Sequence, residues 1–199
     1  MLKIYGPARS RASRSLWMAE EIGLPYEHID FAGMETDERN EVLTGVNPMA
    51  KVPAIEDGDL KLFESMAINL YLAEQYGTEL WPDNEPDRAR TVQWSVFAMT
   101  EIEPPLVQLF LERVIHTDEN RDKDNEAKAL NDLVRPMKVL DVHLEGQDHL
   151  LGDKFSTADL NLASIFTLGQ VARYDMVEYP NVADWANRCL DRPAYKRVR

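Results

Sequence analysis

The spacing of apolar residues predicts the first elements of the chain. An apolar strand is expected over residues 2–5, and apolar and small residues then recur at helical spacing over 10–22. Gly23 follows, where glycine commonly ends a helix because it adopts the left-handed conformation at little cost. Residues 25–31 alternate between apolar and polar, which indicates a second strand, and a right-handed crossover makes that strand parallel to the first.

The next stretch completes a small α/β domain. A polar helix is expected over 35–43, and a hairpin over 54–63 because the tight-turn sequence 56–59 separates two short apolar runs. A further helix is expected over 64–77. The order is therefore βαβ, short helix, ββα, which predicts a mixed sheet with helices packed on it.

Helical patterns alone follow the proline-containing linker at 81–86. One amphipathic pattern covers 88–116 and is expected to bend at Pro104–Pro105, and a second ends near residue 146 and is expected to be interrupted at Pro136. Ser156–Asp159 has the form of a capping box, which predicts a helix start directly before an apolar run. With a last helix over 181–190, the fold class is α/β followed by all-α.

Composition narrows the possible partners and the compartment. The 199 residues carry a net charge of −13, which disfavours nucleic acid and anionic membranes as partners. The single cysteine, Cys189, excludes an intrachain disulfide and a Cys-rich zinc framework. Since no apolar run reaches the roughly 18 residues that span a bilayer, and the start does not resemble a signal peptide, we expect a soluble cytoplasmic protein.

One stretch departs from the acidic average. Residues 1–19 contain four basic residues and no acid. They either form a solvated helix face or attract an anion. The four are Lys3, Arg9, Arg11 and Arg14.

Three short segments are candidates for binding chemistry. Ser10 lies at the predicted helix start, where its hydroxyl either caps the helix or donates to a bound thiolate. Val52–Pro53 is a candidate cis bond whose exposed Val52 main chain would pair with an extended peptide, although spacing alone favours an ordinary trans proline. Glu64 and Ser65 either cap the next helix or hold the ammonium and carboxylate of an amino acid. Together the three suggest a short peptide ligand with an amino-acid end and a thiol.

The same segments resemble cytosolic glutathione transferases of bacterial type. Residues 5–14 look like the serine-bearing opening of that family, and residues 47–55 with 62–68 are similar to its glutathione-site signature. The resemblance implies a thioredoxin-like glutathione-binding domain over 1–80, an all-helical domain over 87–199, and a homodimer. It also implies glutathione as co-substrate and attack of its thiolate on a small hydrophobic electrophile.

The resemblance also implies roles for individual residues. Ser10 would donate to the glutathione sulfur, with Ser13 as the second choice because the register of the loop is open, and Arg11 could supply an N–H or a charge to the same sulfur. The Lys51–Pro53 segment would hold the cysteinyl part, with Val52 pairing and a cis Pro53 fixing the geometry. Glu64 and Ser65 would bind the γ-glutamyl end. Since no cysteine precedes residue 189, thiol-transfer branches of the family are disfavoured.

Several points stay open at this stage. The electrophile pocket is expected between the domains, and Trp94, Phe97, Ala98 and Glu101 either line it or form ordinary core. Isomerisation, peroxide reduction and dehalogenation would use the same thiolate, and a non-enzymatic interaction or ligand-carrier protein is the alternative function. No metal is expected, because His28, His116, His143 and His149 form no pair at ligand spacing and read as surface residues.

Overall fold

The computed structural model describes residues 1–77 and 79–198, and it divides into two compact units. The first unit contains Met1–Trp81 together with the described residues from Asp191 onward, and the second contains Pro82–Leu190. The sequence led us to expect a helical domain over 87–199, and in this division the described residues from Asp191 onward group with the first unit.

The first unit is built on a four-stranded mixed sheet with the order β2-β1-β3-β4. Strand β1 pairs in parallel with β2 and antiparallel with β3, and β3 forms a hairpin with β4. The parallel crossover and the hairpin were both predicted from the sequence. The strands are β1 (Leu2–Tyr5), β2 (Tyr26–Ile29), β3 (Ala54–Asp57) and β4 (Leu60–Phe63).

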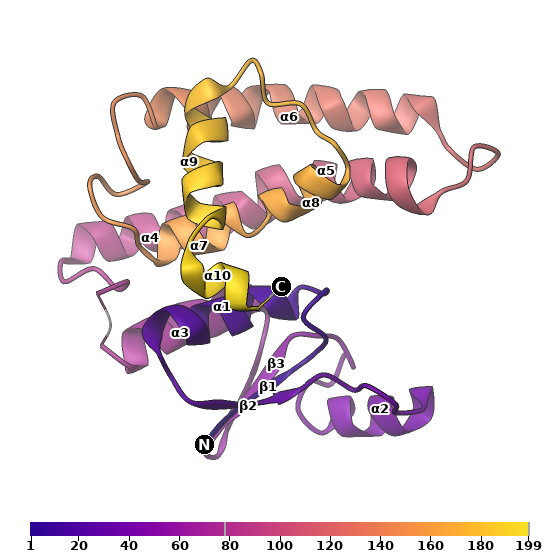
Figure 1. Cartoon of the computed structure of the whole chain (residues 1–199), viewed down its shortest axis with the longest axis vertical. Coiled ribbons are helices and arrows are strands. Elements are labelled where there is room, and N and C mark those ends of the chain that lie inside the picture. Colours follow the sequence, from indigo (N-terminus) through magenta and orange to yellow (C-terminus); the bar gives the residue numbers. More distant parts are fainter. Residues whose placement is uncertain (78, 199) are drawn as a thin grey trace. The chain divides into compact units, whose positions relative to one another are not determined.

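Helices α1 (Ala12–Ile22) and α3 (Ser65–Gln75) pack against each other beside this sheet (Figure 1). Helix α2 (Thr36–Thr44), in the same unit, contributes the buried Leu43 to a core cluster that contains Tyr5. Strand β1 contacts both α1 and the cluster that contains Leu43 of α2. It can do so because successive side chains of a strand point to opposite faces of the sheet. Helix α1 begins two residues later than predicted, and it ends as predicted at Gly23, which has a φ of 66°.

The second unit begins with one long helical run that contains two π turns. Helix α4 (Glu85–Phe97) is followed by a π-helical turn over Ala98–Ile102, then α5 (Glu103–Phe110) and a second π turn over Leu111–Ile115. The prolines at 104 and 105 lie in the first turn of α5, where a missing N–H costs no hydrogen bond. A bend was expected at these prolines, and the structure places a π turn directly before them.

Helix α6 (Lys123–His143) corrects another expectation, because it continues through Pro136 without interruption. Pro136 is buried, as are Leu133, Met137 and Leu140 around it. This buried face keeps the helix continuous although the proline cannot donate a hydrogen bond. The remaining helices of the unit are α7 (Thr157–Ala163), α8 (Phe166–Val171) and α9 (Pro180–Leu190).

A short last helix, α10 (Pro193–Arg197), was not predicted and belongs to the first unit. Its Tyr195 ring lies 4.8 Å from the ring of Trp17 on α1. Two arginines of this segment bind glutamates of α1: Arg192 binds Glu21, and Arg197 binds Glu20. Among the described residues, no helix is long and apolar enough to cross a bilayer.

Candidate functional site

The loop between β1 and α1 is shaped by Gly6, which the sequence analysis passed over. Gly6 has a φ of 127°, and a Cβ added to it would lie 2.7 Å from the Cβ of Val52 and 2.8 Å from that of Ala12. Its N–H donates to the carbonyl of Ile29, and its carbonyl lies 2.8 Å from Nε2 of His28. A glycine here therefore lets the loop after β1 touch the Val52–Pro53 segment. The Gly-Pro pair in the sequence was the available signal.

Ser10 closes the turn that leads into α1. Its hydroxyl donates to the carbonyl of Pro7 at 2.7 Å and accepts the N–H of Ala12 at 3.1 Å. The half-buried side chain thus caps the helix start, which is the first of the two roles expected for Ser10 from the sequence. To donate to a thiolate instead, the hydroxyl has only to rotate away from the Pro7 carbonyl.

Ser13 lies one turn further and is also half-buried. Its hydroxyl donates to the carbonyl of Ser10 at 2.9 Å. Both candidate hydroxyls therefore bind main-chain carbonyls of the same turn, and their contacts do not rank them. Arg11, between them, is exposed and occupies the N-cap position of α1.

Tyr5 is excluded as the hydroxyl that would serve a thiolate. It is 5% exposed, packs in the core cluster with Phe31, and donates to the Glu56 carboxylate at 2.8 Å. Burial and the adjacent Glu56 carboxylate raise the pKa of this phenol. The tyrosine is thus part of the core.

The Val52–Pro53 peptide bond is cis. The loop before it is held by Asn47, which is 3% exposed, donates to the carbonyl of Lys51 at 2.8 Å and accepts the N–H of Met49 at 3.0 Å. Pro53 is buried, Val52 is half-buried and Lys51 is exposed. Asn47 is a second residue that the sequence analysis did not single out; its place directly before a proline was the only local signal.

The start of α3 carries an unusual backbone conformation. Glu64 has φ 73° and ψ 112°, a region that a residue with a side chain seldom adopts. Its side chain is exposed, and its carbonyl accepts the N–H of Ile68 at 2.9 Å. Strain of this kind is found at ligand sites more often than elsewhere, so this residue remains a candidate for binding.

Ser65 follows and is 4% exposed. Its hydroxyl accepts a hydrogen bond of 3.3 Å from Nη1 of Arg14, which lies on α1 and is 3% exposed. Along the sequence, Arg14 is only one of four cations near the start. The structure instead joins it to a second predicted segment, 51 residues away.

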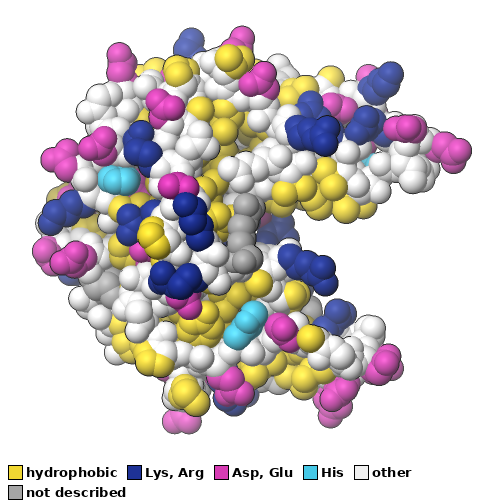
Figure 2. Space-filling model, viewed as in Figure 1, with side chains coloured by type: hydrophobic (Ala, Val, Ile, Leu, Met, Phe, Trp, Pro, Cys, Tyr) yellow, Lys and Arg dark blue, Asp and Glu magenta, His cyan; other side chains and the backbone are white. Residues whose placement is uncertain are grey.

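The three predicted segments therefore meet in the first unit. Gly6 approaches Val52, and Arg14 of α1 reaches Ser65 of α3. Arg9, Arg11 and Lys51 are exposed in the same segments. Figure 2 shows acidic and basic side chains interspersed on the face that it draws, without one continuous basic area. On this face, no broad basic surface is available to attract an anion.

Trp94 and Phe97 pack together within the second unit. Their ring centroids are 5.3 Å apart, and Trp94 also lies 4.6 Å from the ring of His143. Trp94 and Ala98 are buried, Phe97 is half-buried and Glu101 is exposed. The first two contacts support the core interpretation for Trp94, while the pocket expected between the domains stays a prediction.

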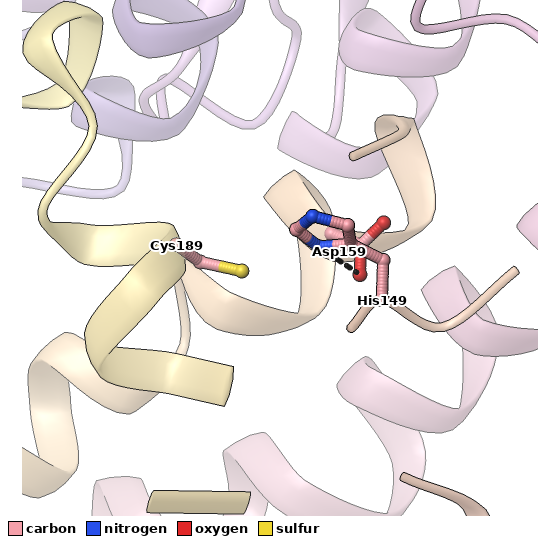
Figure 3. A group of neighbouring side chains, drawn as sticks. All are labelled: His149, Asp159 and Cys189. Atoms are coloured by element: carbon pink, nitrogen blue, oxygen red, sulfur yellow. Dashed lines mark ion pairs between the residues drawn. The ribbon is translucent and has the colours of Figure 1, made fainter. Parts of the chain in front are cut away.

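One group of side chains in the second unit has the composition of a metal site (Figure 3). Ligand atoms of His149, Asp159 and Cys189 lie within 4.8 Å of one another, and Nδ1 of His149 is 3.7 Å from Oδ1 of Asp159. Histidine spacing along the chain gave no hint of this group, and His143 and His149 are half-buried rather than on the surface as expected.

The hydrogen bonds of Asp159 argue for a folding role of this group. Oδ1 accepts the N–H of Leu150 and the indole N–H of Trp185, each at 2.8 Å, while Oδ2 accepts the N–H and the hydroxyl of Ser156. A carboxylate offers about four acceptor positions, and all are used here. A cation would have to displace one of these bonds, so we assign Asp159 to the predicted capping box, which the structure confirms.

Comparisons with known proteins match this chain to glutathione S-transferases over nearly its whole length. Residues 2–74 match the model of the glutathione S-transferase N-terminal domain, and residues 102–193 match that of the C-terminal domain. Glutathione S-transferase F9 of Arabidopsis thaliana is 31% identical, with 100% of this chain and 96% of the relative covered. A glutathione S-transferase of Hyoscyamus muticus is 33% identical, with 99% and 97% covered. The crystal structure of the theta class glutathione S-transferase from Xanthomonas axonopodis pv. citri, with glutathione bound, has a TM-score of 0.87 and 31% identity, covering 99% of this chain and 96% of that one.

Proposed function

The chain belongs to the glutathione S-transferase family, and from this premise we propose that it binds glutathione along the first unit and directs its thiolate at a small hydrophobic electrophile. The observation that supports this most is the meeting of three segments: the α1 start, the cis-Pro53 loop and the α3 start. These are the places where an extended tripeptide finds main-chain partners, helix N-termini and a hydroxyl. The reaction is then accelerated because the electrophile is held close to the glutathione sulfur and because the sulfur is kept as thiolate.

Each end of glutathione has a matching segment. Glu64 and Ser65 would hold the ammonium and carboxylate of the γ-glutamyl end, because the start of α3 attracts anions and Glu64 attracts cations. The main chain of Val52 would pair with the cysteinyl residue, with cis Pro53 fixing its direction and Lys51 exposed beside it. Relatives support this ligand, since the structure from Xanthomonas axonopodis pv. citri has glutathione bound.

Ser10 would stabilise the thiolate. Its hydroxyl turns from the Pro7 carbonyl to the sulfur, and the N-terminus of α1 adds positive potential at the same point. Ser13 is the second candidate, and an N–H near Arg11 is the third.

The test is a comparison of Ser10→Ala with Ser13→Ala. A hydrogen bond to a charged group contributes about 1.5–3 kcal/mol, so loss of the correct serine should raise the pKa of bound glutathione thiol by about 1–2 units. Ultraviolet absorbance of the thiolate measures that pKa, and conjugation of a nitro-activated aryl chloride measures the rate, which should fall about 10- to 100-fold. We expect Ser10→Ala to show both effects and Ser13→Ala neither.

The other outcomes have distinct meanings. If Ser13→Ala alone shifts the thiol pKa, the role moves to Ser13, and if neither variant does, a main-chain donor holds the sulfur. A wild-type chain that does not bind S-methylglutathione, which lacks the thiol, would contradict the proposed site itself. Binding without turnover of any electrophile would instead make the protein a ligand carrier.

We also propose a cytoplasmic homodimer. Val92 and Val96 on α4 are 43% and 55% exposed, and their spacing of four residues places them on one face of the helix. Sedimentation of the wild type should give twice the chain mass of 22.8 kDa. A monomer at micromolar concentration would contradict the dimer and would leave the glutathione site untouched.

A further inference from the structure

Arg14 stands apart from the other cations of the acid-free stretch. It is 3% exposed, whereas Arg9 and Arg11 are exposed and Lys3 is half-buried. Arginine is seldom buried to this extent, because a guanidinium removed from water has to recover its hydrogen bonds inside the protein. The hydrogen-bond partners of the Arg14 guanidinium therefore indicate why this side chain is buried.

One partner of Arg14 is the hydroxyl of Ser65. Nη1 lies 3.3 Å from Oγ and donates to it, across the packed helices α1 and α3. The main chain of Arg14 is held from the same side, because Nδ2 of the buried Asn69 donates to its carbonyl at 3.3 Å. Helix α3 thus binds both the backbone and the side chain of this arginine.

The direction of the hydrogen bond determines what the serine can offer a ligand. A hydroxyl has one hydrogen to donate and two acceptor positions, and a guanidinium can only donate. With Oγ occupied as an acceptor for Arg14, the hydroxyl hydrogen is directed away from the guanidinium. An anion at the start of α3 would receive that hydrogen, and it would also be attracted by the helix N-terminus and by the charge directly behind Ser65.

We propose that Arg14 is a positioning residue for the α-carboxylate of the γ-glutamyl end: its buried guanidinium orients the Ser65 hydroxyl toward that carboxylate. The inference rests on the proposed function and deepens it. It assigns selectivity for a carboxylate at this position to a residue that does not touch the ligand. Arg9, which is exposed, contributes only general attraction.

The experiment uses two ligands that differ in one group. One is glutathione, and the other is its analogue in which the α-carboxylate of the γ-glutamyl residue is a carboxamide. Isothermal titration of the full chain at physiological salt gives a Kd for each, and the ratio of the two Kd values measures carboxylate selectivity. A residue that only supports the fold would weaken both ligands together and leave the ratio unchanged.

The variants are Arg14→Met, Ser65→Ala and their combination, with Arg9→Gln as the control. A hydrogen bond to a charged group corresponds to about a 10-fold or greater effect, so Arg14→Met should weaken glutathione binding about 10-fold and the carboxamide less than about twofold. Ser65→Ala should lower the ratio similarly, and the double variant should lower it no further. Arg9→Gln removes the same charge from the same stretch and should leave the ratio within about twofold of the wild type.

Because a truncated buried arginine can unfold the chain, Arg14→Lys is measured beside it. It keeps the charge but loses the planar donor, and its ratio should fall between those of the wild type and Ser65→Ala. An unchanged ratio in folded Arg14→Met or Arg14→Lys overturns the proposal, as does an equal loss in Arg9→Gln, which would indicate long-range attraction. A wild type that binds glutathione with no preference over the carboxamide overturns the inference alone, whereas a wild type that binds neither ligand overturns the proposed function as well.

Discussion

Gly6 shows how one residue without a side chain sets the spacing of the candidate site. Two constraints act on it: a φ of 127°, which residues with a Cβ rarely adopt, and the side chains of Val52 and Ala12 within 3 Å of where a Cβ would lie. Gly23, at the end of α1, has only the first constraint, because nothing lies within 4 Å of its added Cβ. Comparing substitutions at the two glycines therefore separates the cost of the backbone conformation from the cost of steric crowding.

We predict that Gly6→Ala destabilises the protein by about 2–5 kcal/mol, since left-handed strain costs about 1–2 kcal/mol and overpacking about 1–3 kcal/mol. It should also weaken glutathione binding, because Val52 has to move. Gly23→Ala should cost about 1 kcal/mol and leave binding unchanged. Urea unfolding and calorimetric titration measure the two effects, and equal binding losses in both variants would contradict the assignment of Gly6 to the site.

At the scale of elements, two acidic residues cap helices in different surroundings. Asp159 lies in the first turn of α7, is fully buried and accepts hydrogen bonds from Leu150, Ser156 and Trp185. Asp122 begins α6, and its side chain accepts the N–H groups of Asp124 and Asn125 at the surface. Because water can replace the partner only at the surface, the same substitution has different costs.

We predict that Asp122→Ala costs about 1 kcal/mol, as an exposed N-cap does, whereas Asp159→Ala costs more than about 3 kcal/mol. The larger value reflects several buried donors that lose their acceptor together. Urea unfolding of the two variants gives the comparison. Similar costs would show that the Asp159 network is not the anchor of α7.

Glu112 connects the second π turn to the loop before α6. It is fully buried by its neighbours and accepts from the N–H of Asp122 at 2.8 Å, from the His116 ring and from the Gln108 amide. The hydrogen bond from the Asp122 N–H, followed by that from His116, lowers the pKa of this carboxyl below its usual 4.5. Charged Glu112 thus stabilises the folded state.

The sign of the pH dependence follows from that lowered pKa. The contribution of Glu112 is fully present above its unfolded pKa, and it is lost as the pH falls through the lower folded value. We predict that Glu112→Gln is less stable than the wild type near neutral pH and that the difference shrinks below about pH 4.5. Urea midpoints across this range measure it, and a difference that is constant with pH would contradict the role of the charge.

On the scale of the whole molecule, the two ends of the sequence are joined in one unit. Arg192 binds Glu21 with two hydrogen bonds of 2.7 and 2.8 Å, and the Glu21 side chain is 7% exposed. Arg197 binds Glu20 in a more open position, with side chains 54% and 25% exposed. Although the protein carries a net charge of −13, these two acidic residues are paired with arginines, and the pairs hold the last residues of the chain against α1.

We predict that Arg192→Ala lowers the free energy of unfolding by about 2 kcal/mol, between the values typical of surface and buried pairs, because a largely buried carboxylate loses its partner. Arg197→Ala should lower it by less than about 1 kcal/mol. Thermal and urea unfolding give both values. A larger loss for Arg197→Ala would contradict the dependence on burial.

The sequence by itself determined the order of the elements in the first 80 residues, the mixed sheet and the segments of the candidate site. Apolar periodicity, Gly23, the hairpin turn and the capping box are local features, and each depends on residues within one or two turns. For the same reason the segments around Ser10, Val52 and Glu64 were found from their neighbours alone.

Only the tertiary structure decided which partners those residues have. The contact of Arg14 with Ser65 and the approach of Gly6 to Val52 join residues that are distant in sequence, so no local pattern encodes them. Helix α6 continues through Pro136 because buried packing outweighs the lost hydrogen bond, and the last helix joins the first unit because Glu20 and Glu21 bind its arginines. Local propensity sets the elements; burial and charge pairing between distant residues set what each functional side chain can do.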